Sequence, residues 1–195
     1  MTDLLLLAIC IGAALFALAL FIQPDSFVVR REAVIDAPPR KVFTAIDNLR
    51  NWESWSPWAK LDPNADTRYE GPAAGPGAAF EWSGDKKIGA GRLTIVDSQP
   101  SERVDLTLDM RKPFAATSTV TFVLSPEGEA SDSGWLARAL GFGGASGTGK
   151  THVAWSMSGK AGLISRAMNI FLSRDKMLGE QFEKGLANLG AHLGK

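Results

Sequence analysis

Seven short segments with the character of β-strands, separated by turn residues, restrict the possible fold of this chain more than any other feature. The clearest alternation runs over 102–110, where Val104, Leu106 and Leu108 are separated by polar or charged residues. Successive strand residues point to opposite faces of a sheet, so this pattern predicts a strand with one buried and one solvated face. The other segments occupy 27–36, 67–71, 78–83, 87–97, 115–125 and 150–158. We therefore predict seven antiparallel strands joined by short turns.

Two further segments show helical periodicity. Apolar residues recur every three or four positions over Leu163–Leu193, which predicts a long amphipathic helix with a kink near Ser173 or Gly179. A shorter helix is predicted over 41–49, because apolar residues at helical spacing follow a proline pair that ends at Pro39. Strands that are followed by one long terminal helix indicate an α+β domain.

The N-terminus carries an uncharged apolar run, Leu4–Ile22. As a helix it would be roughly 28 Å long, which is close to the ~30 Å hydrocarbon core of a bilayer. We therefore expect a transmembrane anchor over 1–25 and one folded domain over 26–195. A polar break at Gln23–Ser26 separates the two parts.

Three alternatives concern this apolar run. A cleaved signal peptide would begin with basic residues, and this chain begins with Met1, Thr2 and Asp3. A lipoprotein anchor at Cys10 would need a small residue before the cysteine, where Ile9 stands instead. We prefer an uncleaved single-pass helix. Basic residues follow the run and none precedes it, which favours a cytoplasmic domain; they are Arg30, Arg31, Arg40 and Lys41.

Charge and aromatic composition narrow the functional class. Lys and Arg total 21, as do Asp and Glu, so the chain has no net charge with which to hold nucleic acid. Six Trp and ten Phe against one Tyr indicate an apolar interior or an apolar cavity more than a hydrogen-bonding interface. We exclude nucleic acid as a partner.

Three parts of the sequence resemble one superfamily: Val34–Pro39 with Val42 and Phe43, the Trp-rich Asn51–Trp58, and the closing segment Met177–Leu189. In these parts the chain is similar to the SRPBCC superfamily, which contains START domains, the birch pollen allergen group and polyketide cyclases/dehydrases, and it is nearest to the polyketide cyclase-like branch. The resemblance implies a helix-grip fold, in which a seven-stranded antiparallel curved sheet wraps around a long C-terminal helix. It also implies a cavity between the sheet and that helix.

Apolar residues on the predicted inner faces are candidates for contact with a bound hydrophobic molecule. Large, flexible or aromatic side chains suit the wall of such a cavity, although the same stripe is more often plain core. The candidate ligand-binding residues are Trp82, Met110, Phe114, Trp155, Met157, Met168 and Phe171.

Two carboxylates are weak candidates for catalysis. Glu81 precedes Trp82, and Asp175 interrupts the apolar face of the final helix between Phe171 and Leu178. A buried Asp175 would have a raised pKa and could act as an acid or bind a ligand hydroxyl. The simpler interpretation of both is an exposed, solvated carboxylate.

Other chemical motifs carry little weight. Gly144–Thr151 matches the pattern of a phosphate-binding loop, but an alternating strand follows it where a helix would be required. His152 and His192 lack the spacing and the partners of metal ligands, and the single Cys10 cannot supply a cysteine pair. We expect neither a metal nor a cofactor.

Two aromatic features have open interpretations. Trp52, Trp55 and Trp58 form either core beneath a loop or a stacking platform for a ring-shaped ligand. A Gly/Ser-rich insertion near 126–149 contains Trp135–Phe142, which forms either part of a passive insertion or a short interfacial helix or lid that contacts lipid.

These observations predict a membrane-tethered protein that binds a hydrophobic small molecule such as a lipid, an isoprenoid or a polyketide-like compound. The alternative is a cyclase or dehydrase that uses the cavity carboxylates. A third possibility is an interaction domain whose own side chains fill the cavity.

Overall fold

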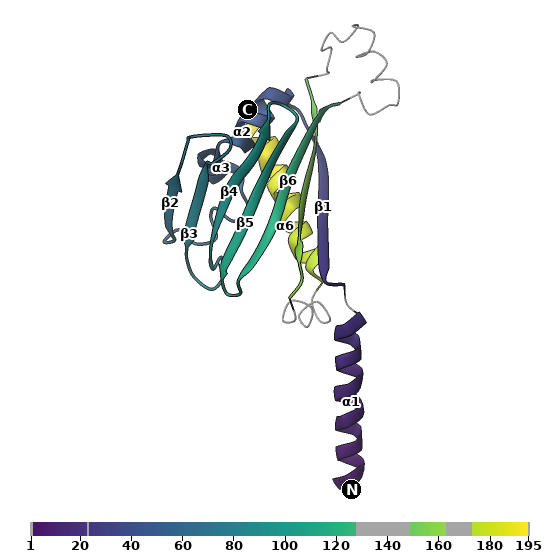
Figure 1. Cartoon of the computed structure of the whole chain (residues 1–195). Coiled ribbons are helices and arrows are strands. Elements are labelled where there is room, and N and C mark those ends of the chain that lie inside the picture. The colour runs from purple at the N-terminus through teal and green to yellow at the C-terminus, as the bar shows by residue number, and fades with distance from the viewer. Residues whose placement is uncertain (1, 23, 128–148, 163–172, 195) are drawn as a thin grey trace.

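Seven antiparallel strands form one curved sheet in the order β1-β7-β6-β5-β4-β3-β2. The computed structural model describes residues 2–22, 24–127, 149–162 and 173–194 (Figure 1). The strands are β1 Ser26–Ile35, β2 Asp66–Glu70, β3 Ala79–Ser83, β4 Ala90–Gln99, β5 Arg103–Lys112, β6 Ala116–Pro126 and β7 Thr151–Lys160. Each predicted segment overlaps one of them, so the predicted seven-stranded antiparallel sheet is confirmed.

The alternation of side chains explains which face of the sheet is buried. On β5, Val104 and Leu106 are fully buried, whereas Arg103 lies on the solvated face and forms an ion pair with Asp105 at 2.6 Å. On β7, Trp155 is only 1% exposed, which confirms the predicted phase of that strand. The inner face therefore supplies the core, and the outer face carries paired charges.

The C-terminal helix α6 spans Arg174–Leu193 and lies across the inner face of the sheet, against β1 and α3 (Figure 1). Its buried residues Phe182, Leu186 and Leu189 follow helical spacing. The helix begins after Ser173, whose hydroxyl accepts a hydrogen bond from the backbone N–H of Lys176 at 3.3 Å. The kink predicted near Ser173 thus coincides with a capped helix start, and the predicted helical residues 163–172 lie outside the described residues.

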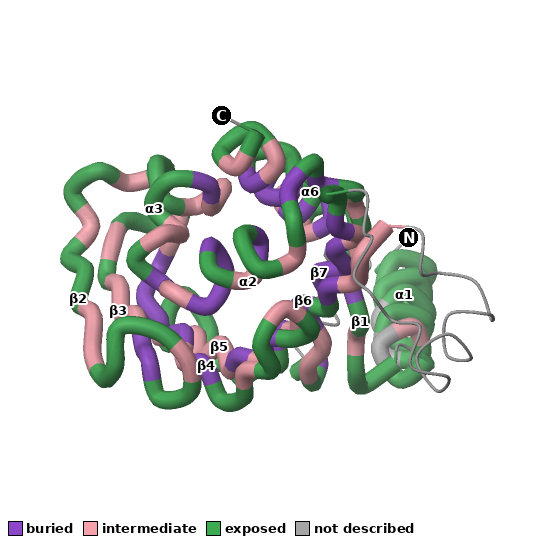
Figure 2. Tube along the Cα trace, turned by 90° about the horizontal axis from the view of Figure 1, so that it is seen from above, coloured by how far each residue is buried: buried purple, intermediate pink, exposed green. Residues whose placement is uncertain are grey.

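Three short helical elements cover one end of the sheet: α2 Pro39–Asp47, the 3-10 helix η1 Leu49–Asn51 and α3 Trp52–Trp55. Figure 2 shows α2 enclosed between the curved sheet and α6. Helix α2 contacts β5, β6 and α6, and the buried hydroxyl of Thr151 donates a hydrogen bond to the carbonyl of Ala37 at 2.6 Å. These contacts close that end of the fold.

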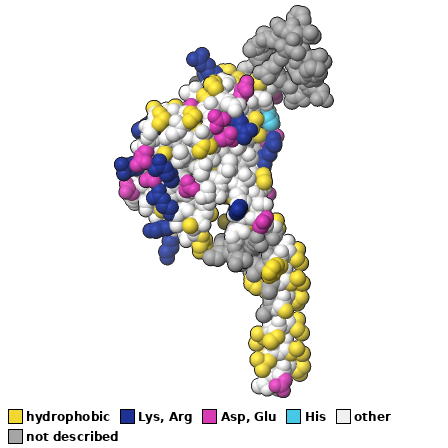
Figure 3. All heavy atoms as spheres, viewed as in Figure 1, with side chains coloured by type: hydrophobic (Ala, Val, Ile, Leu, Met, Phe, Trp, Pro, Cys, Tyr) yellow, Lys and Arg dark blue, Asp and Glu magenta, His cyan; other side chains and the backbone are white. Residues whose placement is uncertain are grey.

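The N-terminal apolar run forms helix α1, Thr2–Ile22, which projects away from the domain (Figure 1). Its large side chains are exposed, with Leu4 at 73% and Phe21 at 88%, and hydrophobic atoms cover it in Figure 3. Within the described ranges, no helix combines the length and the hydropathy that crossing a membrane requires. The predicted transmembrane anchor is therefore not supported, although the helix itself forms where the sequence predicts it.

Candidate ligand-binding cavity

The strand register gives the sheet two distinct ends. Ser26 of β1, which follows α1, pairs with Lys160 of β7. On the other side of β7, Ser118 of β6 pairs with Gly159. Ala90 pairs with Lys112 at the same end. We call this the α1 end of the sheet. The opposite end contains the first residue of β7 and is the end that α2 covers.

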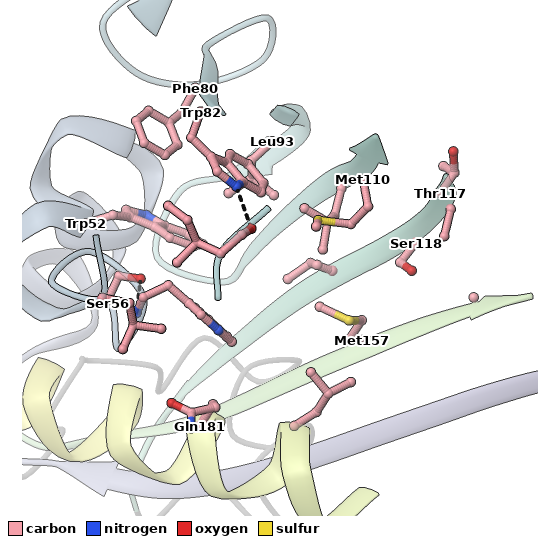
Figure 4. Close-up of a pocket in the computed structure, with 18 of the residues that line it drawn as sticks. Trp52, Ser56, Phe80, Trp82, Leu93, Met110, Thr117, Ser118, Met157 and Gln181 are labelled. Carbon is pink, nitrogen blue, oxygen red and sulfur yellow. Dashed lines mark hydrogen bonds between the residues drawn. The ribbon is translucent and has the colours of Figure 1, made fainter. Parts of the chain in front are cut away.

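A cavity of about 2290 Å³ lies between the inner face of the sheet and α6. Its lining includes Lys160 and two exposed residues, Val28 at 70% and Phe114 at 50%, so among the described residues the cavity opens at the α1 end. Deeper lining residues include Trp52 from α3 and Leu93 from β4 (Figure 4). The cavity thus runs from the α1 end toward the short helices.

An aromatic cluster forms the inner wall of the cavity. Trp155 stacks on Phe182 of α6 with ring centroids 4.3 Å apart and planes 6° apart. Trp52, Trp55 and Trp58 meet Trp155 edge-on, with centroids 6.3, 5.9 and 5.8 Å away. Such stacked and edge-to-face contacts are the favoured arrangements of aromatic rings.

The cluster decides between the two interpretations of the Trp-rich segment. Trp55 is buried, and the indole N–H groups of Trp52 and Trp55 donate to the carbonyls of Ile46 and Ala45 at 2.8 and 3.2 Å. These rings belong to the core. Trp52 and Trp58 are only partly buried and also line the cavity, so the same ladder forms part of its wall.

Trp155 carries the one buried side-chain donor without a hydrogen-bond partner among the described residues, its indole N–H. No described residue offers this N–H a hydrogen bond, so its burial costs free energy that the packing of the cluster must offset.

A second wall comes from β3 and β4. Phe80 stacks on Trp82 with centroids 5.8 Å apart, and the indole N–H of Trp82 donates to the carbonyl of Ile88 at 3.1 Å (Figure 4). A Cβ atom on Gly91 would come within 2.7 Å of the Trp82 ring. Gly91 is therefore the residue that lets this indole lie close against β4.

Five of the seven predicted ligand-binding residues line the cavity: Trp82, Met110, Phe114, Trp155 and Met157. The other two, Met168 and Phe171, lie outside the described residues. The prediction did not include Phe80, Leu93, Leu108 and Ser118, which also line the cavity. Strand alternation places these four on the inner face together with Trp82, Met110 and Met157, so continuing that pattern along each strand would have found them.

Glu81 does not face the cavity, in contrast to the hypothesis that it serves as a cavity acid. It lies between the inward residues Phe80 and Trp82 and points to the outer face, where it contacts Arg92 at 3.1 Å and also Arg111. Hydrogen bonds from Arg92 and then Arg111 lower the pKa of the Glu81 carboxyl. A carboxylate held in the charged form by two arginines is a poor general acid.

Asp175 is also outside the cavity lining. It sits in the first turn of α6, and Arg31 of β1 donates to its two carboxylate oxygens at 3.1 and 3.0 Å. These hydrogen bonds lower the pKa of Asp175, whose side chain is 62% exposed, so the raised pKa that a buried Asp175 would have does not arise. Arg31 contacts Glu183 as well, at 2.7 Å, and thereby ties β1 to α6.

The described part of the phosphate-loop pattern is incompatible with a nucleotide site. Gly149 has a left-handed φ of 75°, and Thr151 is buried as the first residue of β7. A strand therefore follows the glycines where a phosphate-binding loop would need a helix. In the ranges that the structure describes, no three His, Cys, Asp or Glu side chains gather as metal ligands would.

The proposed lid segment Trp135–Phe142 lies outside the described residues. On either side of the undescribed stretch, the backbone N–H of Glu127 donates a hydrogen bond of 3.0 Å to the carbonyl of Lys150. They lie at the end of the sheet opposite α1, because Pro126 pairs with Thr151 there. The described residues that flank Trp135–Phe142 therefore do not border the open side of the cavity, which lies at the α1 end.

A family model described as "Polyketide cyclase / dehydrase and lipid transport" matches residues 26–194. A search of curated protein sequences gave no match. Solved structures share the fold at low identity. A Chromobacterium violaceum protein has a TM-score of 0.54 and 13% identity, with 89% of this chain and 99% of that chain covered.

Two other solved structures are similar to this chain to the same degree. The Aha1 dimer from Colwellia psychrerythraea has a TM-score of 0.54 and 13% identity, covering 86% of this chain and 96% of that chain. Ara h 8.0201 has a TM-score of 0.51 and 14% identity, covering 86% and 97%. At these identities the likeness concerns the fold alone.

Proposed function

Because the chain belongs to the polyketide cyclase/dehydrase and lipid transport family of the SRPBCC superfamily, we propose that it binds a long-chain hydrophobic molecule in the cavity between sheet and α6. The observation that supports this proposal most directly is the cavity, which has a volume of about 2290 Å³ and is walled by aromatic and aliphatic side chains. Ordinary small-ligand pockets measure about 300–1,000 Å³ and are also mostly apolar. A lipid, an isoprenoid or a polyketide-like chain fits the larger space.

Attachment to a membrane through α1 forms the second part of the proposal. The exposed apolar side chains of α1 favour lipid over water. Four further exposed apolar residues line the open side of the cavity: Val28, Leu61, Phe114 and Met177. With α1 in lipid, the open side of the cavity borders the same bilayer, from which an apolar ligand enters with little exposure to water. The basic residues after α1 favour the cytoplasmic side for the domain.

The family description also names cyclases and dehydrases, but neither Glu81 nor Asp175 is among the residues that line the cavity. The two carboxylates proposed for such chemistry are held by arginines outside the cavity. The carboxylates among the described lining residues are Glu53, Asp62 and Glu180. Asp62 is occupied, because its oxygens accept the backbone N–H groups of Asn64 and Asp85 at 3.0 and 2.8 Å.

Native mass spectrometry of the full chain, purified in mild detergent, tests the binding proposal. We expect adducts with the masses of long-chain compounds, and we expect them to weaken in Met157→Trp, whose larger side chain narrows the cavity beside the aromatic cluster. Val96→Trp is the matched control, because Val96 is 52% exposed and does not line the cavity. An adduct-free wild type that also fails to take up an added fluorescent fatty acid would refute the proposal.

A further inference from the structure

The inner face of the sheet changes from polar to apolar along β6 and β7. Starting from the α1 end, the inward positions of β6 are Ser118, Val120, Phe122 and Leu124. On the neighbouring β7 they are Gly159, Met157, Trp155 and Val153. Ser118 is thus the one polar side chain among these inward positions, and it stands nearest the open side.

Ser118 is 9% exposed and lines the cavity, and its hydroxyl forms no hydrogen bond with any described residue. Unlike the indole N–H of Trp155, its oxygen is not a fully enclosed unpaired atom. Its cross-strand neighbours are Leu108 on β5 and Gly159 on β7. Figure 4 shows Ser118 on the cavity wall, between Met110 and Met157. Among the described residues the hydroxyl therefore has no partner, and it faces the cavity.

Gly159 makes the room in which this hydroxyl lies. A Cβ atom on Gly159 would stand 2.8 Å from the Ser118 oxygen and 3.1 Å from the ring of Phe27. A glycine opposite a lone hydroxyl leaves space beside the oxygen on the cavity side. A buried hydroxyl costs free energy until a partner bonds to it, and here the cavity is where a partner can come from.

Charged residues at the same end indicate the kind of partner. Lys60, Lys87 and Lys160 all line the open side, and none forms an ion pair with a described residue. Two carboxylates lie on that side. Asp62 already accepts two backbone N–H groups, so Glu180 is the carboxylate that remains to balance the three lysines. An anionic oxygen is the acceptor that these cations favour.

We infer that Ser118 donates a hydrogen bond to the carboxylate head of an amphiphile whose chain runs inward to Trp155. This inference rests on the proposed function and adds the orientation and the head-group chemistry of the ligand. The apolar chain lies along Met157 and the aromatic cluster, where it loses contact with water. The head stays at the α1 end, within reach of the lysines.

Affinity measurements with two matched probes test the head-group contact. Delipidated full-length protein is titrated with oleic acid and with methyl oleate, which has the same chain without the charge. We expect oleate to bind the wild type about ten times more tightly, and Ser118→Ala to lose most of that preference, since a hydrogen bond to a charged group is worth roughly that factor. Ser118→Val, an apolar residue in an apolar wall, should behave in the same way.

Ser156→Ala is the matched control. Ser156 lies on the other face of β7, and its hydroxyl donates to the carbonyl of Thr121 at 3.4 Å. We expect its preference for oleate to equal that of the wild type. Unchanged affinities in both Ser118 variants would overturn the inference while leaving the proposed cavity function intact. Failure of both probes to bind the wild type would instead refute the proposed function.

Photo-crosslinking tests the orientation separately. One fatty acid carries a diazirine next to the carboxylate, and the other carries it at the chain end. Peptides that contain Ser118 should be labelled by the first probe, and peptides that contain Trp155 or Trp52 by the second. The reverse pattern would show that the head lies deep in the cavity and would overturn the inference.

Discussion

At the residue scale, Trp155 is a buried side chain that takes part in most of the ring contacts of the site. It stacks on Phe182, meets three other tryptophans edge-on, and still borders the cavity. One indole thus serves both the core and the ligand wall. Arg31 also serves two contacts at once, because its guanidinium forms ion pairs with two carboxylates of α6. These two side chains are cross-strand neighbours on β1 and β7, and together they join the helix to the sheet.

Replacing Trp155 tests its role in the core. We expect Trp155→Ala to lower the free energy of unfolding by about 3–5 kcal/mol, because an aromatic-to-alanine change in a core leaves a cavity. Denaturant unfolding measures the loss. A change below about 1 kcal/mol would place Trp155 outside the core and contradict the strand phase.

The Arg31–Asp175 pair predicts a dependence of stability on pH. Arg31 lowers the pKa of Asp175, so the stabilising contribution is present above the unfolded pKa of about 3.9 and is lost as the pH falls through the lower folded value. Asp175→Asn should therefore be less stable than the wild type at pH 7, and the difference should shrink in acid.

Unfolding curves at several pH values measure this difference. Glu180→Gln is the control, because Glu180 is an exposed residue of the same helix without an ion pair to a described residue. An Asp175→Asn deficit that stays constant down to acid pH would show that the carboxylate stabilises the protein by some other means.

At the element scale, α6 depends on glycines in an unusual way. A Cβ atom on Gly179 would collide with the Arg31 guanidinium at 2.0 Å, and one on Gly185 would lie 2.6 Å from the Trp155 ring. Glycine is normally unfavourable inside a helix. Here the missing side chains allow the helix to approach β1 and the aromatic cluster closely, and the cavity wall forms at that contact.

A pair of alanine substitutions separates packing from helix propensity. Gly185→Ala should destabilise the domain by about 1–3 kcal/mol, because overpacking against Trp155 outweighs the propensity gain. Gly190→Ala meets nothing within 4 Å and should stabilise the domain by about 0.5–1 kcal/mol. Thermal or denaturant unfolding measures both. Equal stabilisation by the two substitutions would mean that α6 does not press on Trp155 at this point.

At the scale of the whole molecule, the domain and α1 are separate in sequence and in contacts. The domain closes on itself through the pairing of β1 with β7, and the carbonyl of Asp25 accepts a hydrogen bond from the backbone N–H of Ala161 at 2.7 Å. Helix α1 begins and ends before these contacts. It therefore adds an apolar surface beside the open side of the cavity without completing the core.

Removal of residues 1–23 tests this separation. We expect a soluble domain that unfolds cooperatively and retains its ligand, because no core residue of the sheet lies in the deleted part. The full chain should float with liposomes in a density gradient, and the truncated chain should remain at the bottom. Loss of cooperative unfolding would show that α1 belongs to the fold, and flotation of the truncated chain would show that α1 is not needed for attachment.

The sequence by itself determined the seven strands, the terminal helix and the inner face, because side-chain periodicity follows directly from strand and helix geometry. It also placed Trp155 and Met157 on that face correctly. Tertiary structure alone decided what stands opposite each residue. Arg31 forms an ion pair with Asp175, and Arg92 and Arg111 form ion pairs with Glu81, although these residues are apart in the sequence. Gly159 leaves open space beside the Ser118 hydroxyl. Local pattern fixes the face of a side chain, whereas its pKa and its hydrogen bonds depend on residues brought close only by the sheet register and by the docking of α6.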